Sequence, residues 1–137
     1  MVILAAVSDT ETDESIVAEA ARLAEAFDDE LHAVYVQTYD SLNEAEADST
    51  DESIKQRAAA TAEAATEGLD VPTVPVGRIG EPAAEVLEYA ETVETRYIVI
   101  GGQKRSPVGK ALFGSTTQQI LLGAELPVLT VMGHGDE

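Results

Sequence analysis

A glycine-rich loop that also carries basic residues is the segment with the clearest potential for chemistry. It runs from Gly101 to Ser115 and holds Lys104, Arg105 and Lys110, three of the 8 basic residues of the chain. Glycine allows the backbone to approach a ligand closely. A helix that begins near Gly114 would direct amide groups and the positive end of its dipole toward an anion. The loop is therefore a candidate phosphate-binding site.

The candidate ligand-binding residues of this loop are Gly101, Gly102, Lys104, Gly114, Ser115 and Thr116. The loop is not a P-loop, because Lys104 stands five residues before Gly109 where that motif has glycine, and Ala111 replaces its Ser or Thr. The alternative is a plain connection, in which the basic side chains pair with nearby acids and Ser115 caps a helix.

The segments around this loop alternate between strand-like and helical patterns. The strand-like segments are Val2–Val7, Leu31–Val36, Val71–Val76, Tyr97–Ile100 and Leu126–Met132. Helical periodicity covers Ile16–Phe27, Thr50–Glu67, Pro82–Val93 and Ser115–Leu122, with Gly68 and Gly123 as stops, and residues 37–49 read as a solvated loop with room for a helical turn. This alternation predicts an α/β fold, a doubly wound five-stranded parallel sheet with helices on both faces.

Proline placement and chain order predict the arrangement of the strands. Pro72 and Pro75 lie in the third strand, and proline belongs at the edge of a sheet. Right-handed crossovers then favour the order 3-2-1-4-5. The chain reverses direction between the first and fourth strands, so a ligand is expected beyond their carboxyl ends, at Ser8, Asp9 and Gly101.

Composition limits the classes of function. The chain has 137 residues, no cysteine and a formal charge of −18 from 26 acidic and 8 basic residues. We expect a single domain over residues 1–132 with a flexible tail at 133–137, a cytoplasmic location, and no nucleic-acid or membrane partner. Scattered acids and few lysines favour a halophilic surface, and an ordinary acidic protein is the alternative.

Taken with its neighbours, the loop resembles that of the universal stress protein family. Nucleotide-binding members carry Gly, two residues, Gly, nine residues, then Gly with Ser or Thr. Gly101, Gly114 and Ser115 match this pattern in register, while Lys104 stands at the middle glycine. The segments Gly80-Glu81-Pro82 and Leu126–Val131 are also similar to those of the family.

The resemblance implies a set of nucleotide contacts. Gly101, Gly114 and Ser115, together with Thr116, would surround the phosphates of ATP, with or without Mg²⁺. The backbone of Val36 would meet the adenine. Ser8 occupies the place of the family's usual aspartate, with Asp9 displaced by one residue. Lys104 would either block close approach or supply a counter-charge to the phosphates.

Other polar residues offer weaker candidates for chemistry. His32 is interpreted as a strand residue and His134 as part of the tail, so neither predicts a catalytic base. Ser8 and Asp9 lack a histidine partner for nucleophilic catalysis. The acids at Asp40, Glu44, Glu46 and Asp48 do not have calcium-loop spacing. We therefore expect no catalytic residue and no protein-bound metal.

The leading hypothesis is an ATP-binding stress-response or regulatory protein without efficient catalysis. We expect a homodimer formed through Leu126–Met132, because an apolar edge strand needs cover, and because the family resemblance implies the same assembly. One alternative is a nucleotide-free dimeric interaction module of the same fold, and another is a slow ATPase. The sequence leaves these alternatives open.

Overall fold

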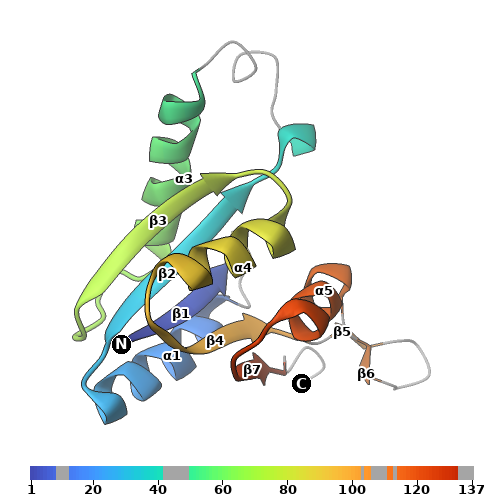
Figure 1. Ribbon diagram of the computed structural model, residues 1–137. Coiled ribbons are helices and arrows are strands. Elements are labelled where there is room, and N and C mark those ends of the chain that lie inside the picture. The colour runs from blue at the N-terminus through green and yellow to red at the C-terminus, as the bar shows by residue number, and fades with distance from the viewer. Residues whose placement is uncertain (9–12, 42–49, 103, 106–110, 113, 133–137) are drawn as a thin grey trace.

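The computed structural model describes residues 1–8, 13–41, 50–102, 104–105, 111–112 and 114–132. Its centre is a five-stranded parallel sheet in the order β3-β2-β1-β4-β7 (Figure 1). The strands are β1 (Val2–Val7), β2 (Glu30–Gln37), β3 (Thr73–Ile79), β4 (Thr95–Gly101) and β7 (Val128–Val131). The predicted fold class and strand order, 3-2-1-4-5, are confirmed.

Four α-helices cover the two faces of this sheet. They are α1 (Asp13–Phe27), α3 (Asp51–Ala65), α4 (Pro82–Thr92) and α5 (Ser115–Gly123), and a short 3₁₀ turn, η1 (Tyr39–Ser41), follows β2. One core cluster joins α1 and α3 to the sheet, and the other joins α4 and α5 to the opposite face. Within β1, Ile3 and Ala5 belong to the first cluster and Leu4 to the second. The continuous apolar run of β1 is thus explained by burial on both faces.

The third strand lies at the sheet edge, as its prolines predict, but runs further along the chain than expected. The sequence predicts Val71–Val76, whereas β3 spans Thr73–Ile79. Gly77, Arg78 and Ile79 continue the ladder opposite Tyr35, Val36 and Gln37. Tertiary pairing therefore extends this strand beyond its local apolar pattern.

Gly77 has a second role, because helix α3 packs directly on it. A Cβ atom at this position would overlap the backbone of Lys55 and Ala59 and lie 2.8 Å from the Cβ of Ala58. The missing side chain is what lets α3 approach the edge of the sheet. It follows that Gly77 sets the position of α3 over β2 and β3.

Turn residues define the ends of the helices. Thr50 caps α3 by accepting a hydrogen bond from the Ser53 amide at 3.1 Å. Gly68, with a φ of +87°, follows the end of that helix. Gly80 has a φ of +141°, which glycine adopts readily, and Pro82 occupies the first turn of α4. These features agree with the turn signals in the sequence.

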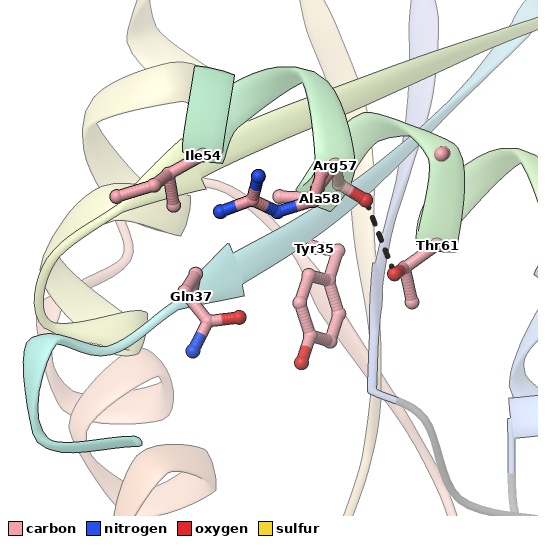
Figure 2. A pocket seen from close by; sticks show the side chains of 7 residues that line it. Tyr35, Gln37, Ile54, Arg57, Ala58 and Thr61 are labelled. Carbon is pink, nitrogen blue, oxygen red and sulfur yellow. Dashed lines mark hydrogen bonds between the residues drawn. The ribbon is translucent and has the colours of Figure 1, made fainter. Parts of the chain in front are cut away.

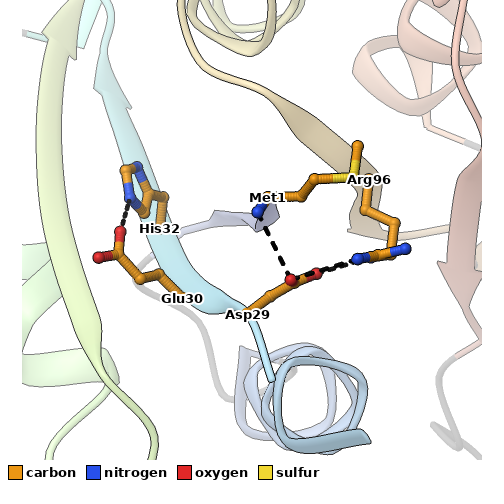
Figure 3. Close-up of polar contacts among 5 residues, drawn as sticks. All are labelled: Met1, Asp29, Glu30, His32 and Arg96. Carbon is orange, nitrogen blue, oxygen red and sulfur yellow. Dashed lines mark hydrogen bonds and ion pairs between the residues drawn. The ribbon is translucent and has the colours of Figure 1, made fainter. Parts of the chain in front are cut away.

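An ion-pair cluster closes the end of the sheet opposite the carboxyl ends of the strands (Figure 3). The buried carboxylate of Asp29 accepts hydrogen bonds from Arg96 at 2.7 and 3.4 Å, and the amino group of Met1 lies 3.6 Å away. The Arg96 guanidinium also lies 4.2 Å from the centre of the Phe27 ring. The hydrogen bond from Arg96 holds the pKa of Asp29 below its ordinary value. This cluster ties β1, β2 and β4 together at their starts.

Another difference from the sequence predictions lies in the glycine-rich loop. Two short strands, β5 (Lys104–Arg105) and β6 (Ala111–Leu112), pair antiparallel within a segment expected to be irregular.

Among the described residues, no helix is both long and apolar enough to cross a membrane. Residues 133–137 lie outside the described residues, as does most of the segment 37–49.

Candidate nucleotide site at the carboxyl edge of the sheet

The register of the parallel strands aligns predicted site residues from three neighbouring strands, β2, β1 and β4. Val7 of β1 pairs with Tyr35 of β2, so the next residues, Ser8 and Val36, are level. Ala5 pairs with Val99, which places Gly101 of β4 level with Val7. Neighbouring strands are about 4.8 Å apart, so β2 and β4 are separated by roughly 10 Å. Val36, Ser8 and Gly101 therefore form a row across the sheet of a length that suits a nucleoside phosphate.

A hydrogen bond joins the two ends of the glycine-rich loop. The buried side chain of Thr117 donates from Oγ1 to the carbonyl oxygen of Gly101 at 2.6 Å. This contact connects residues 16 positions apart and holds the first turn of α5 beside the end of β4. Sequence reasoning selected Thr116 and missed Thr117. A threonine in the first turn of a helix can be either a cap or a surface residue. No local signal in the sequence therefore distinguished Thr117 from Thr116.

The start of α5 leaves open space at Gly114. This residue is the N-cap, with φ −68° and ψ 164°, and no side chain caps the helix. A Cβ atom placed on Gly114 would meet no atom of the described residues within 4 Å. Neither backbone conformation nor internal packing therefore requires glycine here, in contrast to Gly77. The first amides of α5 have no partner within the helix, and exposed Ser115 and half-buried Thr116 lie in the same turn.

The other predicted site residues have varied surroundings in the structure. Gly102 is buried, and its amide donates to the carbonyl oxygen of Val131 at 3.2 Å, so this N–H serves the sheet. The backbone of Lys104 pairs with Leu112 in the β5–β6 ladder. Ser8 is exposed at the end of β1, and Asp9 lies outside the described residues. The Val36 side chain packs against the core cluster of α4 and α5, which leaves its backbone as the group able to meet a base.

A cavity of about 410 Å³ lies between β2 and α3, next to Val36 (Figure 2). Its lining residues are Tyr35, Gln37, Ile54, Arg57, Ala58, Ala60 and Thr61. Tyr35 and Gln37 flank Val36 along β2, so their side chains occupy the opposite face of the sheet from that of Val36. Sequence reasoning missed this cavity. A signal was present in Arg57, one of the 8 basic residues of the chain, which lies on a helix otherwise rich in alanine.

Among the described residues that line the cavity, Arg57 is the one cation and none is a carboxylate. Arg57 donates to the Ser53 hydroxyl at 3.4 Å. The Thr61 hydroxyl donates to the backbone carbonyl of Arg57 at 3.2 Å. The Gln37 amide donates to the Thr38 carbonyl at 3.3 Å. The positively charged side chain of Arg57 in this lining suits an electron-rich ligand.

His32 lies elsewhere, in β2 on the face covered by α4. It is buried, with Nδ1 2.7 Å from the Tyr89 hydroxyl and Nε2 3.0 Å from Glu30 (Figure 3 shows the latter contact). Burial raises the pKa of the Tyr89 hydroxyl. Nδ1 thus contacts α4 and Nε2 contacts a neighbouring residue of β2, and both contacts agree with the interpretation of His32 as a strand residue. Within the described residues, no group of three or more His, Asp or Glu side chains could hold a metal ion.

The model of the universal stress protein family matches residues 1–132. A universal stress protein from Mycolicibacterium smegmatis is 43% identical over 51 residues, which is 37% of this chain and 39% of that relative. The matched stretch therefore spans well under half of that relative's length.

Solved structures show the same fold at lower sequence identity. A universal stress protein from Archaeoglobus fulgidus has a TM-score of 0.72 and 24% identity, covering 95% of this chain and 97% of its own. A second structure from that organism, in complex with dAMP, has a TM-score of 0.61 and 21% identity, with 95% and 96% covered. A universal stress protein in complex with cAMP has a TM-score of 0.62 and 20% identity, with 96% of each chain covered.

The family match extends over nearly the whole chain, and the strand order, the Gly80-Glu81-Pro82 helix start and the Gly101–Ser115 loop lie within it. This chain belongs to the universal stress protein family.

Proposed function

We propose that this protein binds an adenine nucleotide at the carboxyl edge of its sheet and acts as a homodimeric stress-response regulator. The observation that carries the proposal is the start of α5 at Gly114, where the first amides lack a partner within the helix and a Cβ atom would meet no described residue within 4 Å. The structures of relatives bound to dAMP and cAMP support a nucleotide carrying at least one phosphate. ATP, with or without Mg²⁺, is the specific ligand that we propose.

The residues around this edge fit such a ligand. The amides of α5 and the hydroxyls of Ser115 and Thr116 would hold the phosphates, whose charge the helix dipole favours. Gly101 lies at the end of β4 and is tied to α5 by Thr117. The backbone of Val36 would meet the base, and Ser8, between Val36 and Gly101, would lie near the ribose. A bound nucleotide would bring negative charge to this edge of the sheet. The protein groups named above would fix the orientation of that nucleotide.

The dimer is proposed through the free edge at β7. Val128–Val131 pairs with β4 on one side only, and Leu129 and Met132 are 37% and 39% exposed. Leu122, in the adjacent helix α5, is 88% exposed. A second copy pairing along the segment Leu126–Met132 would cover these apolar side chains and satisfy the strand edge.

The binding test begins with the protein as isolated. After purification in molar KCl, denaturation and chromatography of the supernatant would reveal a near-stoichiometric adenine nucleotide. Gly114→Val places a branched side chain in the proposed phosphate space and should abolish the nucleotide-induced rise in melting temperature. Ala84→Val places the same side chain at an exposed position of α4 and should leave that rise intact. If Gly114→Val and wild type bound nucleotide equally, the proposed site would be wrong.

Efficient catalysis is not part of the proposal, because no candidate general base is in evidence among the described residues at this edge. A slow ATPase remains the enzymatic alternative. Incubation of the pure protein with labelled ATP would distinguish it: product formation above that of the Ser115→Ala variant would support hydrolysis at this site.

A nucleotide-free interaction module is the second candidate, favoured by one specific observation. Lys104, in place of the family's middle glycine, contributes its backbone to the β5–β6 ladder. A loop paired with itself need not enclose phosphates. Protein that stays empty after soaking in ATP and magnesium, but gains affinity on Lys104→Gly, would favour this candidate.

A further inference from the structure

The cavity between β2 and α3 adjoins the place proposed for the base. Tyr35 and Gln37 line it and flank Val36, whose backbone is the proposed contact of the base. A purine held at Val36 has a second polar edge, with N7 and the substituent on C6, and a neighbouring cavity can receive that edge. The volume of about 410 Å³ lies low in the range of roughly 300–1,000 Å³ for small-molecule pockets, which suits part of a nucleotide.

The walls of the cavity combine an apolar surface with polar groups. Ile54 and Ala58 are buried in α3 and, with the ring of Tyr35, supply apolar contact for a flat ring system. Figure 2 shows the side chains of Arg57 and Gln37 directed to the same side of the cavity, beside Tyr35. An apolar wall with a few convergent polar groups is the usual composition of a site that orients a heterocycle.

The hydrogen-bonding character of the polar groups is mixed. Arg57 carries only donors, whereas the side-chain amide of Gln37 has both a donor and an acceptor. Thr61 lines the cavity and gives its hydroxyl hydrogen to the Arg57 carbonyl, so its oxygen keeps only the capacity to accept. The cavity can thus satisfy a carbonyl through Arg57, and an amino group through Gln37 or Thr61.

These side-chain types discriminate between purines in other settings. Arginine pairs with the O6 and N7 of guanine, and glutamine with the N6 and N7 of adenine. We propose that Gln37 and Arg57 together determine base specificity, and that Arg57 makes the site accept 6-oxopurine as well as 6-aminopurine nucleotides. This inference rests on the proposed nucleotide function and extends it to the class of base.

Two monophosphates that differ only in the six-position chemistry of the base test this directly. Titration calorimetry with AMP and with IMP should give wild-type dissociation constants within about tenfold of each other. Arg57→Met should weaken IMP binding about tenfold or more, the discrimination expected of one such contact, and AMP binding by less than about threefold. Gln37→Met should show the reverse preference.

Arg22→Met is the matched control, because it removes the same charge from an exposed position of α1 outside the cavity. It should change the affinities for AMP and IMP equally. Circular dichroism and melting temperature of each variant would establish that the fold is kept. Arg57 is exposed, so its replacement leaves the core intact.

The outcomes separate this inference from the proposed function. If AMP binds but IMP binds more than about a hundredfold more weakly, or if Arg57→Met weakens both equally, the assignment of Arg57 is overturned while nucleotide binding stands. If wild type binds neither monophosphate nor ATP, the proposed function falls, and the base assignment falls with it.

Discussion

The hydroxyl of Thr117, on the first turn of α5, donates a 2.6 Å hydrogen bond to the carbonyl oxygen of Gly101, at the end of β4. The Thr117 side chain is buried, so its hydroxyl depends on the carbonyl of Gly101 rather than on solvent for a hydrogen-bond partner. The bond fixes the distance between the two ends of the proposed phosphate loop. It therefore couples local stability to the geometry of the ligand site.

Thr117→Val should lower the free energy of unfolding by about 0.5–1.5 kcal/mol, the range for the loss of one intramolecular hydrogen bond. It should also weaken nucleotide binding, because the start of α5 is no longer held against β4. Urea unfolding and titration calorimetry measure the two effects. Thr92→Val is the control, since Thr92 makes a similar 2.7 Å bond to the Tyr89 carbonyl at an exposed position. Equal losses in both variants would contradict a special role for Thr117.

Gly77→Ala should be strongly destabilising. The added Cβ would overlap the backbone of Lys55 and Ala59, so α3 would have to move away from β3. Overpacking of this kind costs about 1–3 kcal/mol, and backbone atoms yield less readily than side chains. Gly114→Ala, where the new Cβ meets nothing, provides the comparison in the same denaturation experiment. A Gly77→Ala protein as stable as Gly114→Ala would show that α3 is not held at this distance.

Asp29 should make stability depend on pH in the acidic range. Its pKa in the folded protein is lowered by the hydrogen bond from Arg96, so the carboxylate contributes stability above the ordinary value of 3.8. That contribution is lost as pH falls through the lower folded pKa. Asp29→Asn should therefore lose about 1.5–3 kcal/mol at neutral pH, the range for hydrogen bonds to charged groups. The gap between variant and wild type should shrink below about pH 4, and a gap independent of pH would refute this account.

Leu129→Lys should convert the proposed dimer to monomers. A lysine on β7 places charge in the interface proposed along Leu126–Met132, where its desolvation is unfavourable. Val74→Lys is a closely matched control, because Val74 is also 37% exposed and lies on the opposite edge strand, β3. Sedimentation equilibrium gives the mass of each variant. Monomers from both variants, or from neither, would be inconsistent with a dimer through β7.

High salt should stabilise the protein if the acidic surface is an adaptation to it. The formal charge of −18 is self-repulsive, and the screening length falls from about 10 Å at 0.1 M to about 3 Å at 1 M salt. The melting temperature should rise between these KCl concentrations. A neutral osmolyte at equal osmolarity separates charge screening from solvent exclusion. A flat or falling melting temperature would favour the ordinary acidic protein.

By itself, the sequence was enough to predict the fold and the family of this protein. The apolar run of β1 required burial on both faces, the prolines assigned β3 to an edge, and Gly80 with Pro82 marked the start of α4. These signals are local, because strand periodicity, proline geometry and turn conformation depend on a few consecutive residues. The loop pattern of Gly101, Gly114 and Ser115 is likewise readable along the chain.

Only the tertiary structure shows which residues are needed for packing and which have open space beside them. The space that a side chain at Gly77 would need is filled by the backbone of α3, whereas a Cβ atom at Gly114 would meet no described residue. The two glycines look alike in the sequence. Thr117 rather than Thr116 reaches Gly101, and Arg57 joins Tyr35 and Gln37 around one cavity. These relations connect residues far apart along the chain, and such contacts exist only once the sheet register and helix packing have brought them together.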